Sequence, residues 1–381
     1  MLSFLHKGIG RRQIFSLCLL SLVMFVLTGC WDKKEFNQMA IVQTLAVDKH
    51  ENEYKVTLQL ITPKAGEKGI TGEDLWIISG QGESVAAALD QADLSTPRRI
   101  YLEQMNLILL GEGVLADDLM GGYRYLTRSH YLRRSNYVLA IKGEAGEIIA
   151  AKPELGKIDI FYLTNLIKDQ ERKIKNSVTL VNDCLLAAHS TTGAVFIPAV
   201  ILEAKEKLTL DGGALVKNNQ LVDWVDQAWT ESYYWVCGEI KQKPLVLQDV
   251  WKAGDMVVLE VEKSRCHLVV KQQQPLVIGL EIEAELDMVD NRGVHNVADE
   301  KELEQSLEQV RQRAEQEIEA IVKEGLDKAQ SLNCDAFNLG QWLAAFHQSV
   351  AAQYDWQKDF KDIELEVEVK TEIKSLLINQ K

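Results

Sequence analysis

The chain has 381 residues, which at about 100–200 residues per domain corresponds to two or three domains. Apolar residues make up 46% and charged residues 26%, as in ordinary globular proteins, so a disordered, collagen-like or disulfide-stapled chain is excluded. The formal net charge of −14 argues against a nucleic-acid-binding protein, because phosphate contacts require clustered lysine and arginine side chains.

The N-terminus has the layout of a secretory signal. Lys7, Arg11 and Arg12 precede an almost wholly apolar run, residues 14–26, and no acidic residue lies before it. This run is shorter than the ~20 residues that a membrane-spanning helix needs. It ends in Leu27-Thr28-Gly29-Cys30, the small-residue pattern before a cysteine that forms the lipobox of a bacterial lipoprotein. We therefore expect residues 1–29 to be a lipoprotein signal peptide.

Cys30 is the predicted modification site. Its thiol would carry S-linked diacylglycerol, and the amine freed by cleavage would be N-acylated, for example with palmitate. The alternative is an ordinary signal peptide with an incidental cysteine. Removal of residues 1–29 takes away three basic residues and no acidic ones, which changes the net charge to −17. Because anionic headgroups repel such a surface, we expect the lipid to hold the protein at the membrane and the folded body to stay in water.

The remaining cysteines do not suggest a metal site. Cys18 leaves with the signal, and Cys184, Cys237, Cys266 and Cys334 are too widely spaced for a zinc-binding pair. One disulfide among these four is possible outside the cytoplasm, although free buried thiols are the simpler expectation.

Residues 30–195 alternate between strand and helix patterns, which predicts an N-terminal mixed α/β domain. Ser84 is the expected N-cap of the first helix, and residues 50–52 are the expected turn of a hairpin. Residues 63–72 are rich in Gly, Lys and Pro and predict a loop. The expected strands are 39–48, 53–62, 74–79, 106–110 and 136–142, and the expected helices are 84–94 and a short one from Val114.

Residues 196–280 predict a smaller α+β domain. Strands are expected at 195–203, 208–217 and 220–225, with Asn218-Asn219 as a tight turn because Asn tolerates positive φ. A helix at 227–236 would pack Trp229, Tyr233 and Val236 inward. A β-meander is expected from the segments 256–261, 267–271 and 277–286.

Residues 281–381 predict a C-terminal α+β domain built from a long acidic helix packed on an antiparallel sheet. The helix is expected at 299–330, with Asp299 and Glu302 as a capping box and an apolar stripe close to 3.6-residue spacing. A second helix is expected at about 340–353, and residues 362–374 alternate as a half-buried strand. The stripe consists of Leu303, Leu307, Val310, Ala314, Ile318, Ile321 and Leu326. The fold class is thus α+β, with three mixed α/β domains.

Residues 281–327 contain fifteen acidic and five basic residues. A solvated helix face is the ordinary interpretation of such a run, and a docking surface for a basic partner is the alternative.

We find no motif that predicts catalysis, a metal or a cofactor. The histidines have no ligand spacing, and neither a nucleophile elbow nor a phosphate-binding loop occurs. Gly111 to Ala116 fits G-x-G-x-x-A, the glycine pattern of a dinucleotide-binding turn. Two residues argue against such a site. Glu112 would place a negative charge beside the dinucleotide phosphates, and Arg133-Arg134 stands near the position where an acidic residue would bind the ribose. A glycine-bounded turn between strand and helix is the favoured interpretation.

Two residue clusters, one basic and one aromatic, leave alternatives open. Arg124, Arg128, Arg133 and Arg134 lie among tyrosines 123, 125 and 131 and form either a solvated face or a contact to headgroups or a partner protein. A second cluster is aromatic and favours core packing over a ligand box; it consists of Trp224, Trp229, Tyr233, Tyr234 and Trp235.

The lipobox with Trp31-Asp32 and Glu35, followed by Ala46-Val47-Asp48-Lys49, resembles the start of the Ger(x)C family, the lipoprotein C-subunits of spore germinant receptors. Similar segments recur along nearly the whole chain. They are Ile108 to Glu112, Arg134 to Gly143, Gly213 to Val222, Asp335 to Gly340, Trp356 and Ile363 to Val369. Three features differ from the family pattern: Gln104 replaces a His, no Pro lies between Gly340 and Trp356, and no Gly follows the last strand.

The resemblance implies a lipid-anchored, non-catalytic receptor subunit with a three-domain body on the extracytoplasmic side of the inner spore membrane. Its implied partners are membrane-embedded A and B subunits, with no nucleic acid and no cofactor, and Cys30 is the one functional residue carried over. The alternatives are a lipid-anchored solute-binding protein of a transporter and an exported hydrolase.

Overall fold

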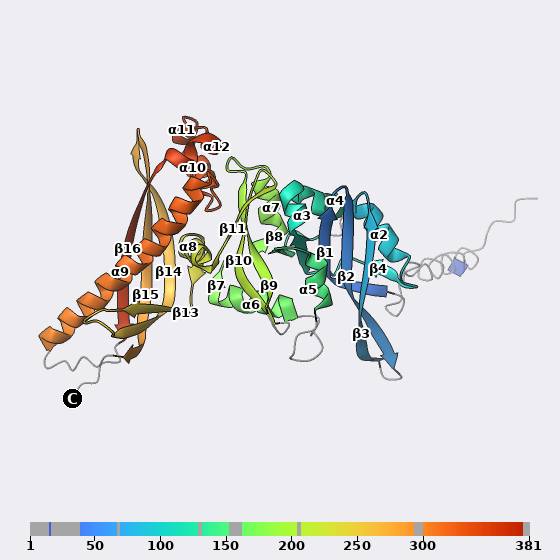
Figure 1. The fold of residues 1–381 in the computed structure, drawn as a ribbon, viewed down its shortest axis with the longest axis horizontal. Helices are drawn as coiled ribbons and strands as arrows, with labels where there is room; N and C mark the ends of the chain where they lie inside the picture. Colours follow the sequence, from blue (N-terminus) through green and yellow to red (C-terminus); the bar gives the residue numbers. More distant parts are fainter. Residues whose placement is uncertain are drawn as a thin grey trace, which may run out of the picture.

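The computed structural model describes residues 15–16, 39–66, 69–128, 132–151, 162–203, 207–292 and 300–375. The described body is elongated (Figure 1), with the first strands and helix α2 near one end of the long axis and helix α9 at the other. Two large β-sheets of this described body, each covered by helices, follow one another along this axis, and a third sheet has only two short strands.

The first sheet has the strand order β11-β10-β9-β6-β5-β1-β2-β3, with β1 in its interior. Its central pairs β1–β5, β5–β6 and β6–β9 are parallel, whereas hairpins extend it antiparallel at both edges. Two short strands, β4 and β8, pair with β1 and β6. The strands are β1 (Met39–His50), β2 (Glu53–Gly66), β3 (Gly69–Gly82), β4 (Arg99–Tyr101), β5 (Leu107–Gly111), β6 (Tyr137–Ile141), β8 (Thr179–Leu180), β9 (Ala194–Glu203), β10 (Lys207–Lys217) and β11 (Gln220–Val225).

Both faces of the first sheet are buried, so its central strands are continuously apolar. Ile108 and Leu110 of β5 belong to one core cluster, and Leu107 and Leu109 belong to another on the opposite face. The helices of this region are α2 (Val85–Asp93), α3 (Glu112–Asp117), the 3₁₀-helix η2 (Leu119–Gly122), α4 (Arg124–Arg128), α5 (Ala145–Ala150), α6 (Tyr162–Lys173) and α7 (Val181–Ala187).

The second sheet has the order β13-β14-β15-β16. It is antiparallel from β13 to β15, and β16 joins β15 in parallel after the long helix α9. The strands are β13 (Lys243–Gln248), β14 (Met256–Gln273), β15 (Leu276–Arg292) and β16 (Glu364–Ser375), and α9 spans Glu300–Ser331. The remaining elements are β7 (Ile174–Lys175), β12 (Glu239–Ile240), α8 (Gln227–Cys237), α10 (Leu339–Phe346), α11 (Gln348–Ala351), α12 (Trp356–Asp359) and η3 (Phe360–Asp362).

Helix α9 buries one stripe against the second sheet. The buried positions are spaced by three or four residues, as helix geometry requires, and they share a core cluster with Leu280 and Ile282 of β15. They are Val310, Ala314, Ile318, Val322, Leu326 and Ala329. The stripe therefore confirms the predicted helix, although Leu303, Leu307 and Ile321 are only partly buried and Val322 is buried in place of Ile321.

Helix α8 joins the two sheets. Its Trp229 ring lies 5.2 Å from the Phe196 ring of β9 and 5.3 Å from the Phe337 ring, measured between centroids. The Trp229 indole also donates a hydrogen bond of 3.0 Å to the Gly325 carbonyl of α9. Phe196 thus belongs to the same core cluster as the second sheet.

The predicted α+β fold class, with a long helix packed on a C-terminal sheet, is confirmed, except that the sheet is not wholly antiparallel because β16 joins β15 in parallel. The β1–β2 hairpin forms as expected, and the Ser84 hydroxyl accepts a hydrogen bond from the Ala87 N–H at the start of α2. Asn218 and Asn219 both have positive φ, as the predicted turn requires.

Three predicted elements are wrong in extent. The loop at 63–72 is largely strand, because β2 and β3 continue as a paired ribbon in which Lys64 lies opposite Gly72. The segments 256–261 and 267–271 are parts of the single strand β14, whose middle carries exposed charged residues such as Arg265. The helix at 340–353 breaks at His347, whose backbone angles are not helical.

The division at residues 195 and 280 stays a prediction. The strands from Ala194 to Val225 continue the first sheet through β6, and those from Lys243 onward form the second. Cys30, the lipobox and Asp299 of the predicted capping box lie outside the described residues.

Candidate functional site

Asp48, at the end of β1, is a buried carboxylate that fixes helix α5. Its two oxygens accept hydrogen bonds from the Ala145 N–H (2.6 Å) and the Gly146 N–H (2.9 Å), at the helix start. Burial raises the pKa of the Asp48 carboxyl, and these two hydrogen bonds oppose the rise. Asp48 therefore acts as a helix anchor between two elements that are far apart in sequence.

The glycines of the G-x-G-x-x-A segment serve close packing around this carboxylate. A Cβ on Gly111 would lie 2.1 Å from the nearer Asp48 oxygen, and one on Gly113 would lie 2.1 Å from the Lys49 carbonyl oxygen. The Glu112 side chain accepts a hydrogen bond of 3.0 Å from the Trp224 indole. The interpretation as a packed turn between strand and helix is thus favoured over a dinucleotide site.

Asp335 anchors the start of α10 in the same way. Its carboxylate accepts hydrogen bonds from the Leu339 N–H (3.1 Å), the Gly340 N–H (2.8 Å) and the Trp356 indole (2.8 Å). Burial raises the pKa of the Asp335 carboxyl, opposed by these donors. A Cβ on Gly340 would lie 2.3 Å from the indole nitrogen, so Gly is required where the Trp356 ring crosses the helix.

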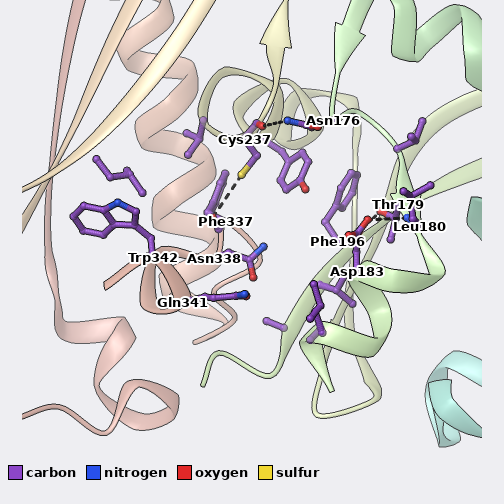
Figure 2. Close-up of a pocket in the computed structure, with 18 of the residues that line it drawn as sticks. Asn176, Thr179, Leu180, Asp183, Phe196, Cys237, Phe337, Asn338, Gln341 and Trp342 are labelled. Carbon is purple, nitrogen blue, oxygen red and sulfur yellow. Dashed lines mark hydrogen bonds between the residues drawn. The ribbon is translucent and has the colours of Figure 1, made fainter. Parts of the chain in front are cut away.

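A cavity of about 580 Å³ lies between the two sheets, beside α8 (Figure 2). One wall comes from α7, β8 and β9 and the other from α8 and α10. Aliphatic and aromatic side chains dominate the lining, with a few uncharged polar groups and the two acidic residues Glu171 and Asp183. Its labelled lining residues are Asn176, Thr179, Leu180, Asp183, Phe196, Cys237, Phe337, Asn338, Gln341 and Trp342.

The polar groups around the cavity are mostly engaged within the protein. Asp183 accepts a hydrogen bond of 2.8 Å from the Leu180 N–H, and the Thr179 hydroxyl donates to the Phe196 carbonyl at 2.6 Å. Burial raises the pKa of Asp183, opposed by the hydrogen bond from Leu180. The Cys237 thiol lies 3.6 Å from the Phe337 carbonyl oxygen, and its burial raises the pKa well above the ordinary value. This thiol is therefore protonated at neutral pH and is a poor nucleophile.

The other cysteines have the same character. Cys184, Cys237, Cys266 and Cys334 are free, as the simpler expectation held. Burial raises the pKa of Cys184, Cys266 and Cys334 to about 12. Within the described ranges, no three His, Cys, Asp or Glu side chains gather as they would around a metal ion. Among the described helices, none is both long and apolar enough to span a bilayer.

The basic cluster and the aromatic cluster have different outcomes. Arg124 pairs with Asp118 at 2.7 Å, and Tyr123 is fully buried, so the basic cluster does not form one face with its tyrosines. Tyr131 lies outside the described residues. Trp229, Tyr234 and Trp235 are core residues, as favoured, whereas Tyr233 also lines the cavity.

The sequence did not reveal the anchoring roles of Asp48 and Asp335, or the cavity. An isolated Asp at a strand end looks the same whether it caps a distant helix or binds a ligand. The one available signal was that both aspartates lie in segments of the family resemblance. The cavity draws its walls from residues 171 to 346, which no local pattern connects.

Two family models match the chain, and together they cover most of it. Residues 32–202 match the model described as spore germination protein N-terminal domain, and residues 211–376 match spore germination B3/GerAC-like, C-terminal. Asp48 lies in the first match and Asp335 in the second, so each matched region contains one of the two buried anchors.

Curated relatives agree with these models. Spore germination protein B3 of Bacillus subtilis (strain 168) is 22% identical over 317 residues, which are 81% of this chain and 82% of that protein. Spore germination protein KC of the same organism is 24% identical, over 94% of both chains. Spore germination protein A3 is 24% identical over 52% of this chain and 54% of its own length.

A solved structure shares the fold. The crystal structure of the GerBC protein superposes with a TM-score of 0.57 at 19% identity, over 87% of this chain and 97% of that one. The resemblance seen in the sequence is thereby confirmed, and the chain belongs to the Ger(x)C family of spore germination proteins, with both its GerAC N-terminal and C-terminal regions.

Proposed function

We propose that this protein is a lipid-anchored, non-catalytic subunit of a spore germinant receptor that works by protein–protein contact in nutrient-triggered germination. The anchor is Cys30, carrying S-diacylglycerol and an N-acyl chain after removal of residues 1–29. The body stands on the extracytoplasmic side of the inner spore membrane, and its partners are the membrane-embedded A and B subunits.

The observation that carries this proposal is the match of both halves of the chain to spore germination family models. The non-catalytic role is supported by the state of the buried reactive groups. The Asp48 and Asp335 carboxylates are used by backbone and indole N–H groups, and the buried thiols hold their protons at neutral pH. Such groups hold elements together and are poorly suited to attack a substrate.

The test is an affinity pull-down of the tagged, full-length protein from detergent-solubilised spore membranes, followed by mass spectrometry. We expect two polytopic membrane proteins in comparable amounts, and Cys30→Ala as the matched variant should leave the protein out of the membrane fraction. Recovery of transporter permease and ATPase subunits would instead favour the solute-binding alternative. Recovery of no membrane protein would contradict the receptor assignment.

A further inference from the structure

The strand register places several exposed residues at the end of the first sheet where β1 begins. Met39, the first residue of β1, lies opposite Arg99 of β4. On the other side, Ile41 lies opposite Ile61 of β2, which lies opposite Leu75 of β3. Neighbouring strands are about 4.8 Å apart, so β4, β1, β2 and the exposed part of β3 form one row within roughly 15 Å.

Trp76 and Leu94 share one face of this row. Trp76, Ile78 and Gly80 are spaced by two residues on β3 and therefore face the same side of the sheet. A Cβ on Gly80 would touch α2 at Ala88 and Ala92, so α2 covers this side. Helix α2 thus runs from Gly82 towards Trp76, and Leu94, its C-cap, lies at the Trp76 end. Trp76 is 51% exposed and Leu94 is 87% exposed, which is unusual for large apolar side chains at one site.

Two arginines lie at the same end of the sheet. Because Arg99 lies opposite Met39, on the side of the sheet that Leu75 also faces, it is on the other face of the row from Trp76. Arg99 is exposed, and Arg98 is partly buried, with one guanidinium nitrogen buried and without a hydrogen-bond partner among the described residues. The nearby Asp93 carboxylate accepts the Ile100 N–H at 3.5 Å, and Glu103 accepts the Tyr101 hydroxyl at 2.5 Å. We call this end of the first sheet, with Trp76, Leu94, Arg98 and Arg99 around it, the entry face.

The short distance in sequence between the proposed anchor, Cys30, and the start of β1 suggests that the bilayer lies against the entry face. Met39 is nine positions after Cys30. Even a fully extended chain of that length spans only about 30 Å, so a lipidated Cys30 keeps the start of β1 close to the bilayer. Tryptophan favours the membrane–water interface, and arginine is attracted to anionic headgroups.

The charge distribution gives the same orientation. The fifteen acidic and five basic residues at 281–327 belong largely to β15 and α9, at the opposite end of the long axis (Figure 1). Anionic lipid repels that end and attracts the arginines of the entry face. We propose that the entry face rests on the anionic bilayer surface, with Trp76 and Leu94 at headgroup depth and the second sheet pointing away; this rests on the proposed lipidation of Cys30.

The test uses the lipidated full-length protein reconstituted into vesicles of phosphatidylcholine and phosphatidylglycerol that contain dibrominated phosphatidylcholine. Bromine quenches tryptophan fluorescence at the bilayer surface. All variants carry Trp31→Phe, because Trp31 follows Cys30 directly and would be quenched through the anchor alone. In this background we expect Trp76→Phe to remove the lipid-quenchable fraction, whereas Trp342→Phe, in α10, leaves it unchanged. Leu94→Glu should lower quenching, and Leu186→Glu, another exposed leucine, should not.

Flotation of the vesicles separates the two proposals. Protein that floats but is not quenched, or is quenched equally after Trp76→Phe, overturns the entry-face proposal and leaves the anchor standing. Protein that does not float contradicts lipidation of Cys30; an N-terminal His-tag in place of residues 1–29, bound to nickel-chelating lipid, then gives the Trp76 readout independently. Quenching that requires co-reconstituted membrane-embedded subunits would assign the entry face to a protein contact and overturn the bilayer contact.

Discussion

Asp335 shows how a single buried carboxylate can organise the end of a domain. It joins the start of α10 to the Trp356 ring through three hydrogen bonds, and its exposed fraction is only 2%. Sequence alone marked Asp335, Gly340 and Trp356 as family-like without giving a reason, because the three residues meet only in the folded chain. Their contacts give them a structural role.

Asp335→Asn is therefore expected to destabilise the protein. The amide group must direct its NH₂ towards one of the N–H donors, and a buried donor left unpaired costs about 1–3 kcal/mol. Urea unfolding measures the decrease in the free energy of unfolding. Trp356→Phe, which keeps an aromatic ring but removes the N–H donor, should cause part of the same decrease. The exposed Asp355→Asn is the control and should change stability by less than about 0.5 kcal/mol. Equal effects at the two positions would contradict the anchoring role.

Because the Cys184 thiol is buried, we expect the folded protein to lose stability at alkaline pH. Burial raises its pKa to about 12 in the folded protein, whereas an unfolded thiol titrates at about 8.5. The folded state thus keeps a proton that the unfolded state loses. The stabilising contribution is complete below about pH 8.5 and falls as pH rises, by up to about 1.4 kcal/mol per pH unit.

Urea unfolding in reducing buffer between about pH 8.5 and 10 measures this dependence. Cys184→Ala should have a shallower slope than the unmodified protein. Val181→Ala, which removes buried atoms from the same helix without a titrating group, should keep the original slope. The same slope in both variants would show that Cys184 does not titrate as its burial implies.

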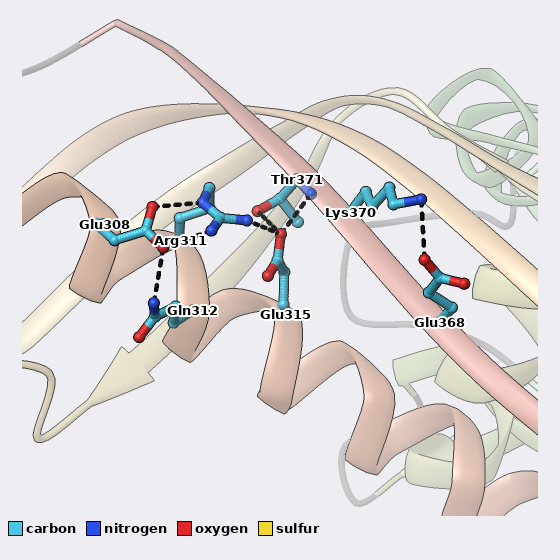
Figure 3. A network of polar contacts seen from close by, with 7 residues as sticks. All are labelled: Glu308, Arg311, Gln312, Glu315, Glu368, Lys370 and Thr371. Atoms are coloured by element: carbon cyan, nitrogen blue, oxygen red, sulfur yellow. Dashed lines mark hydrogen bonds and ion pairs between the residues drawn. The ribbon is translucent and has the colours of Figure 1, made fainter.

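At the scale of elements, Glu315 connects helix α9 to the edge strand β16. Its carboxylate accepts a hydrogen bond of 2.9 Å from the Thr371 N–H and pairs with Arg311 at 2.7 Å. Figure 3 shows this network, with Glu308 on the far side of Arg311 and the Lys370–Glu368 pair along the strand. The helix thus covers a backbone donor on the open side of the edge strand.

Glu315→Ala should loosen β16 locally. Loss of a hydrogen bond to a charged group, worth about 1.5–3 kcal/mol, makes the Thr371 amide exchange roughly ten- to a hundredfold faster with solvent deuterium. Glu319→Ala, which removes an acid paired with Lys323 on the same helix, is the matched control. Unchanged exchange at Thr371 would show that the strand is held by its pairing with β15 alone.

Elements with strong local signals were predictable, and their partners were not. The stripe of α9 and the alternation of β16 result from burial on one side, and the Ser84 cap results from a local hydrogen bond with the Ala87 N–H. No such signal specifies that β16 pairs with β15 in parallel, or that β2 and β3 continue as a ribbon through a Gly- and Lys-rich stretch. In both cases the neighbouring strand decides the structure. The cavity beside α8 was unpredictable for the same reason.

At the scale of the whole molecule, the two sheets share one core through α8. The Phe196 ring on β9 lies 4.8 Å from the Tyr233 ring and 5.2 Å from the Trp229 ring. Lys217 adds a hydrogen bond from β10 to the Gln357 carbonyl at 3.1 Å. The sheets should therefore support each other's stability.

We expect a single thermal unfolding transition by calorimetry. Phe196→Ala, which leaves a cavity at the junction, should lower stability by about 3–5 kcal/mol and speed amide exchange in β14 and β15 as well as β9. Leu202→Ala, on the exposed part of the same strand, should have a small effect. Two separate transitions in the unmodified protein would contradict a shared core.

The strand order also bears on how the polypeptide assembles as it leaves the ribosome or the translocation channel. In the first sheet, β1 comes first and lies inside; β2 and β3 extend one side, and β5, β6, β9, β10 and β11 extend the other in succession. In the second sheet, β13 to β16 are laid down in chain order. Each strand of these two sheets can therefore pair with an open edge when it emerges, and no two strands that are already paired have to separate for a later strand to insert. A chain synthesised from its N-terminus can add the strands of both sheets in order, without rearranging earlier pairs. This limits the time during which unpaired, aggregation-prone strand edges are exposed.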